Sequence, residues 1–387
     1  MNARNPGFTA ARLIQAREAR GYSKSELARL LSLTPAAVSA YETGVRVPSP
    51  DTVDAIAHAL EQPVAFFSRP APRFGERKVF YRSFSAATRT ARLRAQAKMS
   101  LLWDAVDYVQ ELVDLPPVVM PAVGELPGAP EEITQDMIEA AAVIARRHWK
   151  LGENPAPNLV WLLEESGAIV VRHDLGTDRL DAFSEWREAD ARPYFMLNSI
   201  RRNAFRSRAD VAHEIGHVLL HRHVAPACLD DDDTFKLLED QAWRFAQAFL
   251  LPEQAFLRDL SSLNLDALRA LKPKWKVSIA FMLHRVHRLG ILNDDKYTNY
   301  RKYLAQRGWL KVEPYDLETE PERPLLLAQV LEFLIEQKVQ TPDQIASGVG
   351  FNAELLEQLT HVQPGFFSLE RRSRPWNLKM PGLDNTG

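Results

Sequence analysis

The segment His213-Glu-Ile-Gly-His217 constrains this chain more than any other feature of its sequence. Residues four apart lie on one face of a helix, so the two imidazoles can reach a single metal ion. The apolar residues between Ala212 and Leu220 are spaced to give that helix a buried face. Because two histidines and an acid are costly to bury without a partner, the segment favours a metal site over a surface helix with incidental histidines.

Zinc suits this pattern, and the acid within it suits catalysis. A catalytic zinc ion keeps three protein ligands and a water molecule whose pKa falls to about 7. Glu214 lies beside the open metal position, where it could accept the proton of that water for attack on an amide. The single cysteine, Cys228, cannot form a thiolate cluster. The sequence therefore predicts Zn2+ on His213 and His217, with Glu214 as the general base.

A third ligand must come from elsewhere in the chain. His221 lies eight residues from His213, roughly 12 Å along a helix axis, which is too far for two ligands with bonds of about 2 Å to one ion. Glu239 lies at the margin of the apolar face of the next predicted helix, where a carboxylate would point toward a packed neighbour. Its competitors are Asp240 and the acids from Asp230 to Asp233, although those acids read better as a solvated turn with Asp233 or Thr234 as the helix N-cap.

Residues 1–68 read as a bundle of four short helices. Ser23 is a predicted N-cap with Glu26 as its capping-box partner, Thr34 is a predicted N-cap before Pro35, and Gly21 suits a helix end. Apolar residues recur at spacings of three and four and predict one small core, made of Leu13, Leu27, Ala28, Leu31, Val38, Val53, Ile56, Ala57 and Leu60.

The remaining segments differ in composition. Between Arg69 and Lys98, nine Arg and Lys face one acid, Glu76, and a helix is expected from Met99. Proline-rich residues 115–130 then predict a linker. Strand-like runs at 168–172, 180–185 and 193–197 precede the metal segment. We therefore expect a basic helical segment and linker at 69–130, a metal-binding domain at 131–262, and helical modules at 263–312 and 313–387.

Composition limits the location and the partners of the chain. Its 387 residues are enough for several hydrophobic cores. No apolar run reaches the roughly 20 residues of a membrane-spanning helix, and the polar start lacks the core of a secretion signal. We therefore expect a cytoplasmic protein with no membrane partner. The net charge of -2 argues against a continuous nucleic-acid-binding coat, so basic charge matters only locally.

The metal segment, read together with Leu238-Glu-Asp-Gln-Ala-Trp-Arg-Phe-Ala-Gln-Ala-Phe-Leu-Leu-Pro252, resembles the ImmA/IrrE family of bacterial metallopeptidases. The family pattern continues from the His-Glu-x-x-His helix into Glu-x-x-Ala-x-x-Phe-Ala and ends in Leu-Pro. This resemblance implies that Glu239 is the third zinc ligand. It also implies an endopeptidase, because relatives of this family cleave repressors of the XRE class in response to stress.

The segments Arg17 to Ala28 and Val38 to Pro48 resemble the XRE, or lambda-repressor-like, helix-turn-helix. The resemblance implies that helix 35–41 enters the major groove of an operator, and that two heads act as a homodimer on two half-sites. One departure is Ser23-Lys24, where many members have Thr-Gln, so that only a phosphate contact is expected there. The implied DNA contacts are Lys24, Thr34, Pro35, Ala36, Ala37, Ser39, Tyr41 and Arg46.

These patterns predict a mainly α fold with a small β-sheet (α+β), comprising a helix-turn-helix head, a zincin-like domain and C-terminal helical modules. The predicted function is a DNA-binding regulator with a zinc endopeptidase that cuts a repressor or another regulatory protein. One alternative keeps the zinc domain as a non-catalytic sensor or scaffold, and another is an antitoxin-like regulator that needs no zinc. Tyr194, His223 and Arg208 are open candidates for stabilising an oxyanion.

Overall fold

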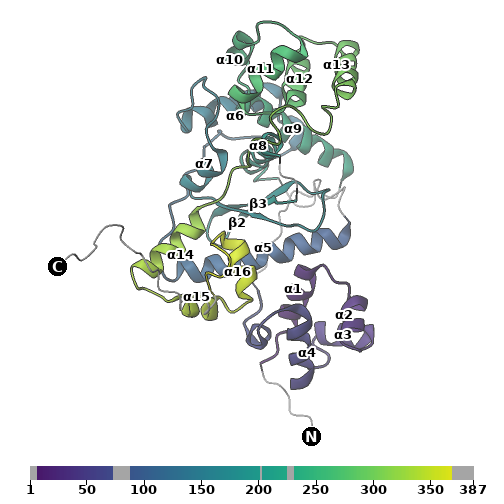
Figure 1. Cartoon of the computed structure of the whole chain (residues 1–387), viewed down its shortest axis with the longest axis vertical. Helices are drawn as coiled ribbons and strands as arrows, with labels where there is room; N and C mark the ends of the chain where they lie inside the picture. Colours follow the sequence, from purple (N-terminus) through teal and green to yellow (C-terminus); the bar gives the residue numbers. More distant parts are fainter. Residues whose placement is uncertain (1–6, 73–87, 201–202, 225–230, 368–387) are drawn as a thin grey trace, which may run out of the picture.

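A computed structural model describes residues 7–72, 88–200, 203–224 and 231–367. Figure 1 shows an N-terminal helical head at one end, helices α10 to α13 at the other, and a small sheet between them. Cys228, Asp230 and part of the basic stretch lie outside the described residues. The predicted fold class, mainly helical with a small sheet, is confirmed.

The head contains α1 (Ala10–Arg20), α2 (Lys24–Leu30), α3 (Pro35–Glu42), α4 (Pro50–Leu60) and the 3-10 helix η1 (Val64–Ser68). The helix caps and the helix end predicted for the head are confirmed. Ser23 and Glu26 form the capping box, Thr34 caps α3, and Gly21 ends α1 with a φ of 75°. Of the predicted core residues only Leu31 is partly exposed, and the others are buried.

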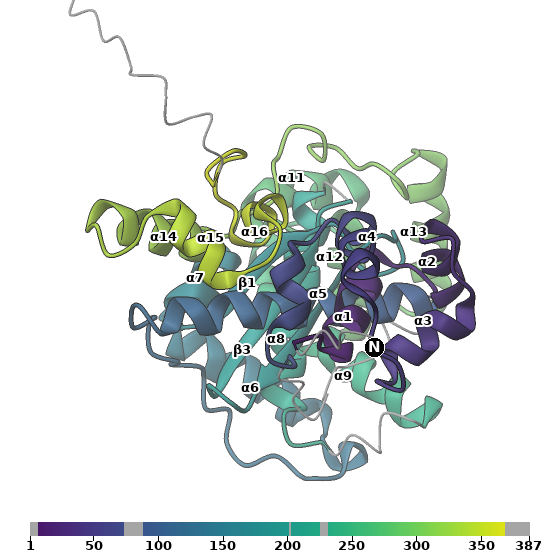
Figure 2. The same ribbon diagram turned by 90° about the horizontal axis from the view of Figure 1, so that it is seen from below.

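Helix α5 (Arg89–Gln110) starts at Arg89 rather than at the expected Met99. Small apolar residues alternate with the basic ones in this part of the helix, and three of them, Ala91, Ala95 and Ala97, are buried. Helix α1 packs along α5, as Figure 2 shows from below. Buried polar groups join the two helices: Arg12 pairs with Asp104, and the Nε2 of Gln15 donates to the Oγ of Ser100 at 2.8 Å.

The sheet separates two hydrophobic cores. Its order is β1 (Ile169–His173), β3 (Arg192–Asn198), β2 (Ala182–Arg187), with β1 parallel and β2 antiparallel to β3. Alternate residues of each strand face opposite sides. Phe183 and Tyr194 belong to the core shared with α5 and the head. Ala182 and Phe195 belong to the core that holds the metal-site helices.

The second core contains α6 (Gln135–His148), α7 (Leu159–Glu165), α8 (Ala204–Leu220), α9 (Asp232–Leu250), α10 (Glu253–Asp259), α11 (Leu265–Trp275), α12 (Ile279–Arg288) and α13 (Asp294–Gln306), with the 3-10 helix η2 (Pro130–Glu132) against α9. Asp231 caps α9, because its Oδ2 accepts from the backbone N of Thr234 at 2.7 Å. The predicted cap at Asp233 or Thr234 was therefore wrong. Leu268 and Met282 pack in the same core as Phe249, so the expected boundary at 262 runs through continuous packing.

The C-terminal helices α14 (Leu326–Glu336), α15 (Pro342–Val349) and α16 (Ala353–Thr360) join the first core, alongside α5 and β1. Two acidic side chains in the segment before them accept hydrogen bonds from the N-termini of other helices. Glu313 accepts from the backbone N of Ile279, and Glu322 from that of Leu159, at the starts of α12 and α7.

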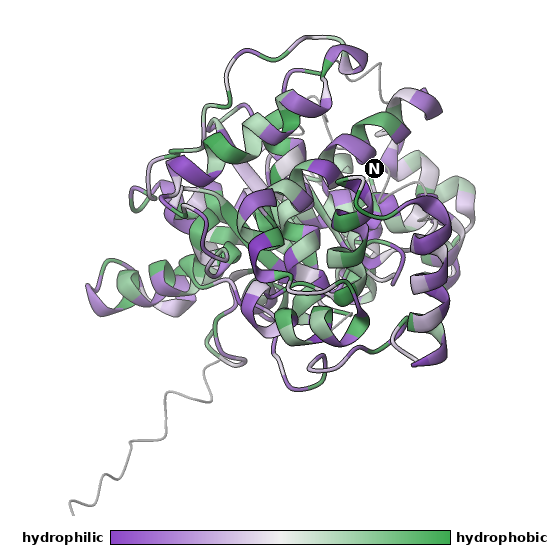
Figure 3. Cartoon of the chain, turned by 90° about the horizontal axis from the view of Figure 1, so that it is seen from above, coloured by the Kyte–Doolittle hydropathy of each residue, from purple (hydrophilic) through white to green (hydrophobic). Residues whose placement is uncertain are grey.

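In Figure 3 the helices carry hydrophobic stretches beside hydrophilic ones, as amphipathic helices covering a core do. No helix within the described ranges is long and apolar enough to cross a membrane.

Candidate functional site

Helices α8 and α9 lie unusually close together, and Gly216 makes this possible. A Cβ placed on Gly216 would lie 3.1 Å from both the Cα and the O of Ala242. Such a contact is tight, so a larger residue at 216 would push the two helices apart. The glycine within the predicted metal segment therefore sets how near the α8 histidines come to α9.

The structure brings His213, His217 and Glu239 together. The Nε2 of His217 lies 3.0 Å from the Nε2 of His213 and 3.2 Å from the Oε1 of Glu239, and the Nε2 of His213 lies 3.5 Å from the Oε2 of Glu239. Tetrahedral ligands with bonds of about 2.0 Å to zinc stand roughly 3.3 Å apart. Two imidazole nitrogens and one carboxylate in this arrangement fit a zinc ion.

The charges at the cluster also fit a cation. Burial alone would raise the pKa of Glu239, but hydrogen bonds with His213 and His217 outweigh it and hold that pKa well below its usual range. Burial opposes the charge on His213, yet Glu239 raises the pKa of this imidazole. Both shifts have one origin, a buried carboxylate that needs a positive partner.

A chain of hydrogen bonds orients His217 from behind. Its Nδ1 lies 3.0 Å from the Nδ1 of His221, and the Nε2 of His221 lies 3.0 Å from the Oε1 of Gln241. The Nε2 of Gln241 donates to the backbone O of Pro130 at 2.7 Å, so its Oε1 is left to accept from His221. His221 then offers a lone pair at Nδ1 to the N–H of His217, which leaves the Nε2 lone pair of His217 directed to the cluster.

Glu214 has a partner on the sheet. The Oγ of Ser184 in β2 donates to the Oε2 of Glu214 at 2.7 Å, and both residues are buried. Sequence reasoning missed Ser184. The signal available was its position between Ala182 and Trp186, because these three alternate residues share the face of β2 that turns toward α8.

A cavity of about 1000 Å³ lies further along the same side of α8. Glu214, Val218 and Arg222 are four residues apart and follow one face of the helix, and Val218 and Arg222 line the cavity. The guanidinium of Arg222 stacks 3.6 Å from the ring centre of Trp186, which comes from the edge strand β2. The cavity is large enough for several side chains of a peptide.

Other candidates from the sequence lie in different surroundings. Tyr194 donates to the Oδ2 of Asp190 at 2.5 Å and belongs to the core on the far side of the sheet. Arg208 pairs with Glu322 and donates to backbone carbonyls. Asp240 pairs with Arg244 and Arg288 rather than with the cluster. Of the three predicted oxyanion candidates, His223 lines the cavity beside Trp186.

In the head, Thr34, Pro35 and Ala36 stand exposed at the start of α3, and Arg46 is exposed beyond its end. Ala37 and Ser39 are partly exposed. The Nζ of Lys24 pairs with Glu42 at 3.1 Å and contacts the Oγ of Ser39 at 3.3 Å. Lys24 therefore links α2 to α3 and also adds a positive charge beside α3.

The predicted DNA contact by Tyr41 is corrected. Its side chain packs in the core of the head, where it is 4% exposed, and the guanidinium of Arg46 covers its ring at 5.8 Å. A tyrosine in that position supports the helix rather than lying on a duplex.

Two families of known proteins match the chain. The family model for the IrrE N-terminal-like domain (Peptidase_M78) matches residues 163–287, and a helix-turn-helix family model matches residues 13–67. The first match spans the sheet, α8 and α9, and continues through most of α12. No curated protein matches the chain significantly.

Proposed function

We propose that this protein, which carries an XRE-type helix-turn-helix domain and an ImmA/IrrE-like peptidase domain, is a DNA-binding regulator with zinc-dependent endopeptidase activity. The observation that carries the proposal is the convergence of His213, His217 and Glu239, with the carboxylate of Glu214 fixed beside them by Ser184. Zinc binding alone needs no acid between the two histidines, so an intact and oriented Glu214 favours catalysis.

Each residue of the cluster has a defined part in this chemistry. His213, His217 and Glu239 would hold the zinc ion, which when bound supplies a Lewis acid and a water of lowered pKa. Glu214 accepts the proton of the attacking water and then returns it to the leaving amine. Ser184 orients Glu214 through one carboxylate oxygen, which leaves the other oxygen for the proton. His221 and Gln241 keep the ring of His217 in the ligand tautomer.

The substrate we propose is a regulatory protein, such as one of the same XRE class as the head. Two features support a protein substrate. In the described sheet β2 pairs with β3 on one side only, and an extended peptide can add to such an edge through its backbone. The cavity beside Trp186 continues from that edge and offers room for side chains. The head would bring the peptidase to a promoter at which such regulators act.

The test is incubation of the zinc-loaded full chain with XRE-type regulators encoded beside its gene, followed by mass spectrometry of fragments. We expect a defined fragment from the wild type and none from Glu214→Gln at equal zinc content. Glu253→Gln serves as the matched control, because Glu253 is an exposed acid on α10, and it should cleave like the wild type. A fragment that persists in Glu214→Gln would contradict the assigned general base.

A second function is favoured by one observation. Glu214 and His213 are each 3% exposed, so a peptide can reach them only if the surroundings open. In the alternative the zinc domain is a sensor or scaffold that responds to metal without turnover. It predicts no fragment from any regulator, together with DNA binding that changes when zinc is removed.

A further inference from the structure

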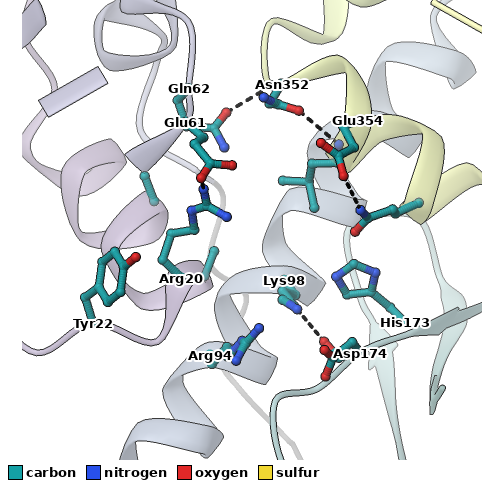
Figure 4. Close-up of a pocket in the computed structure, with 14 residues that line it drawn as sticks. Arg20, Tyr22, Glu61, Gln62, Arg94, Lys98, His173, Asp174, Asn352 and Glu354 are labelled. Carbon is teal, nitrogen blue, oxygen red and sulfur yellow. Dashed lines mark hydrogen bonds and ion pairs between the residues drawn. The ribbon is translucent and has the colours of Figure 1, made fainter. Parts of the chain in front are cut away.

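A cavity of about 190 Å³ lies where the head, α5, the end of β1 and α16 meet. Figure 4 shows Arg20 approaching it from the head, Arg94 and Lys98 from α5, and Asp174 from the end of β1. Pockets that bind drug-sized ligands measure about 300–1,000 Å³. This cavity therefore has room for a ligand of only a few heavy atoms.

Two cations of α5 enter this cavity without a carboxylate partner among the described residues. Lys98 is 5% exposed, and its Nζ donates to the backbone O of Asp174. The Nε of Arg94 is buried and has no hydrogen-bond partner in the part of the chain that the structure describes. Its guanidinium lies against Gly176, where a Cβ would stand 2.0 Å from Nη1. Buried charges are unfavourable unless an opposite charge accompanies them.

The carboxylates that line the cavity have partners other than Arg94 and Lys98. Glu61 pairs with Arg20, the Oδ1 of Asp174 accepts from the backbone N of Gly176 at 2.6 Å, and the Oε1 of Glu354 accepts from Gln358 at 3.2 Å. All three acids are exposed, so water screens their charges more than those of the buried cations.

Burial and neighbouring cations both lower the pKa values of the basic groups inside the cavity. Burial, followed by the charge of Arg94, lowers the pKa of Lys98 to about 7, and Asp174 opposes this only in part. Burial, followed by Lys98, lowers the pKa of His173 to about 3. Apart from burial, the neighbouring cations lower both pKa values more than Asp174 raises them, so the charges nearest Lys98 and His173 are mainly positive.

We propose that this cavity binds a small oxyanion, of phosphate or carboxylate chemistry, between Arg94 and Lys98. The walls belong to separate parts of the molecule: Gln62 of the head accepts from the backbone N of Asn352 at the start of α16, at 3.1 Å. An anion held there contacts α5 and the end of α1 in the head. It therefore stabilises the packing of the head against α5 and α16.

The test uses the full chain in Tris-chloride buffer free of phosphate and carboxylates. Inorganic phosphate, acetate and succinate are titrated separately while the melting temperature is recorded, with sodium chloride at equal ionic strength for comparison. We expect a saturable rise with at least one oxyanion, and the anion that acts at the lowest concentration separates phosphate from carboxylate chemistry. If none of the three gives a rise beyond that of sodium chloride, the proposal is overturned.

Variants separate binding from folding. Arg94→Gln and Lys98→Met should need at least about tenfold more anion for the same shift, as expected when one charge-assisted hydrogen bond is lost. Arg92→Gln, on the same helix but outside the cavity, should respond as the wild type does. Without anion, Lys98→Met should melt no lower than the wild type, because it removes a buried cation that has no carboxylate partner among the described residues. Equal shifts in wild type and both cavity variants would show that no site exists there.

Hydrogen exchange provides a further readout of the head. The oxyanion should slow amide exchange at 16–22 and 352–358, the two sides of the cavity, in the wild type but not in Arg94→Gln. Unchanged exchange on both sides at saturating anion would exclude the proposed effect on the docked head.

Discussion

His221 stands directly behind His217, with 3.0 Å between their Nδ1 atoms. Its other ring nitrogen meets Gln241, whose amide nitrogen is committed to the carbonyls of Pro130 and Ile133. Proton positions along this chain follow from the carbonyls, which can only accept. His221 and Gln241 are thus positioning residues for the metal site.

Replacement of His221 by Ala should weaken zinc binding by about 10- to 100-fold, the usual cost of losing a group that orients a ligand. Competition with a chromophoric chelator measures it, and Gln241→Ala should have the same direction. In the zinc-loaded wild type, ¹⁵N shifts should place the proton of His221 on Nε2. His287→Ala, on α12, is the control. Unchanged affinity in both variants would refute the positioning role.

Ser184→Ala should lower kcat/KM on a cleaved regulator by about 10- to 100-fold, which corresponds to the roughly 1.5–3 kcal/mol of a hydrogen bond to a charged group. Zinc content should stay at the wild-type level, because Ser184 contacts Glu214 and none of the three cluster residues. Ser261→Ala, at an exposed position, should change neither. A loss of zinc in Ser184→Ala would mean that the hydroxyl supports the fold of the site instead.

Lys98 gives a pH dependence whose sign follows from its burial. Its pKa falls from 10.5 to about 7 in the folded chain, so between these values the unfolded chain holds a proton that the folded chain has released. Stability rises with pH wherever the unfolded state binds more protons. The free energy of unfolding of the wild type should therefore rise relative to that of Lys98→Met between about pH 7 and pH 10.5, in oxyanion-free buffer. Parallel curves from urea titrations would contradict the shift.

Ala36→Asp should reduce affinity for duplex DNA at least about tenfold, because it adds a negative charge at the exposed start of α3, next to phosphates in the proposed complex. Arg46→Ala should weaken binding evenly across sequences and reduce the salt slope by about one. Ala129→Asp, an exposed alanine outside the head, is the matched control. Fluorescence anisotropy against salt measures all three, and unaffected binding by Ala36→Asp would exclude α3 as the DNA-reading helix.

Oligomeric state bears on the same surface. We propose a homodimer on two half-sites about one helical turn apart, as for other helix-turn-helix regulators. Light scattering of the chain with and without a duplex carrying two half-sites tests this. One chain per duplex at saturation would contradict the dimer.

Local signals made much of the fold predictable. Caps such as Ser23 and Thr34 fix helix starts through contacts within three residues, and alternation places the strands. The start of α5 was missed because nine cations between Arg69 and Lys98 resemble a solvated segment, whereas the alanines between them pack against the core. The cap of α9 was misplaced by two residues or more because four adjacent acids offer equivalent side chains.

The cluster could be predicted only in part for a related reason. His213, Glu214 and His217 lie within about one helical turn, and their spacing alone predicts a metal site. Ser184 and Gln241 could not be predicted in this way. Ser184 lies in no recognisable motif and its partner is 30 residues away, whereas Gln241 occupies an unspecified position of the Glu-x-x-Ala-x-x-Phe-Ala pattern and donates to a carbonyl 111 residues away. Tyr41 was assigned wrongly for the opposite reason, because its place in the helix predicted to read DNA did not reveal that its ring is buried in the core of the head.

The zinc content of the purified full chain tests the central claim most directly, measured by atomic emission beside Glu214→Gln and Glu239→Ala. The account predicts about one zinc per chain in the wild type and in Glu214→Gln, and a clear loss in Glu239→Ala, because that variant removes one of three ligands. A wild type that holds no zinc after exposure to stoichiometric metal, or a Glu239→Ala variant that keeps it fully, would contradict the account.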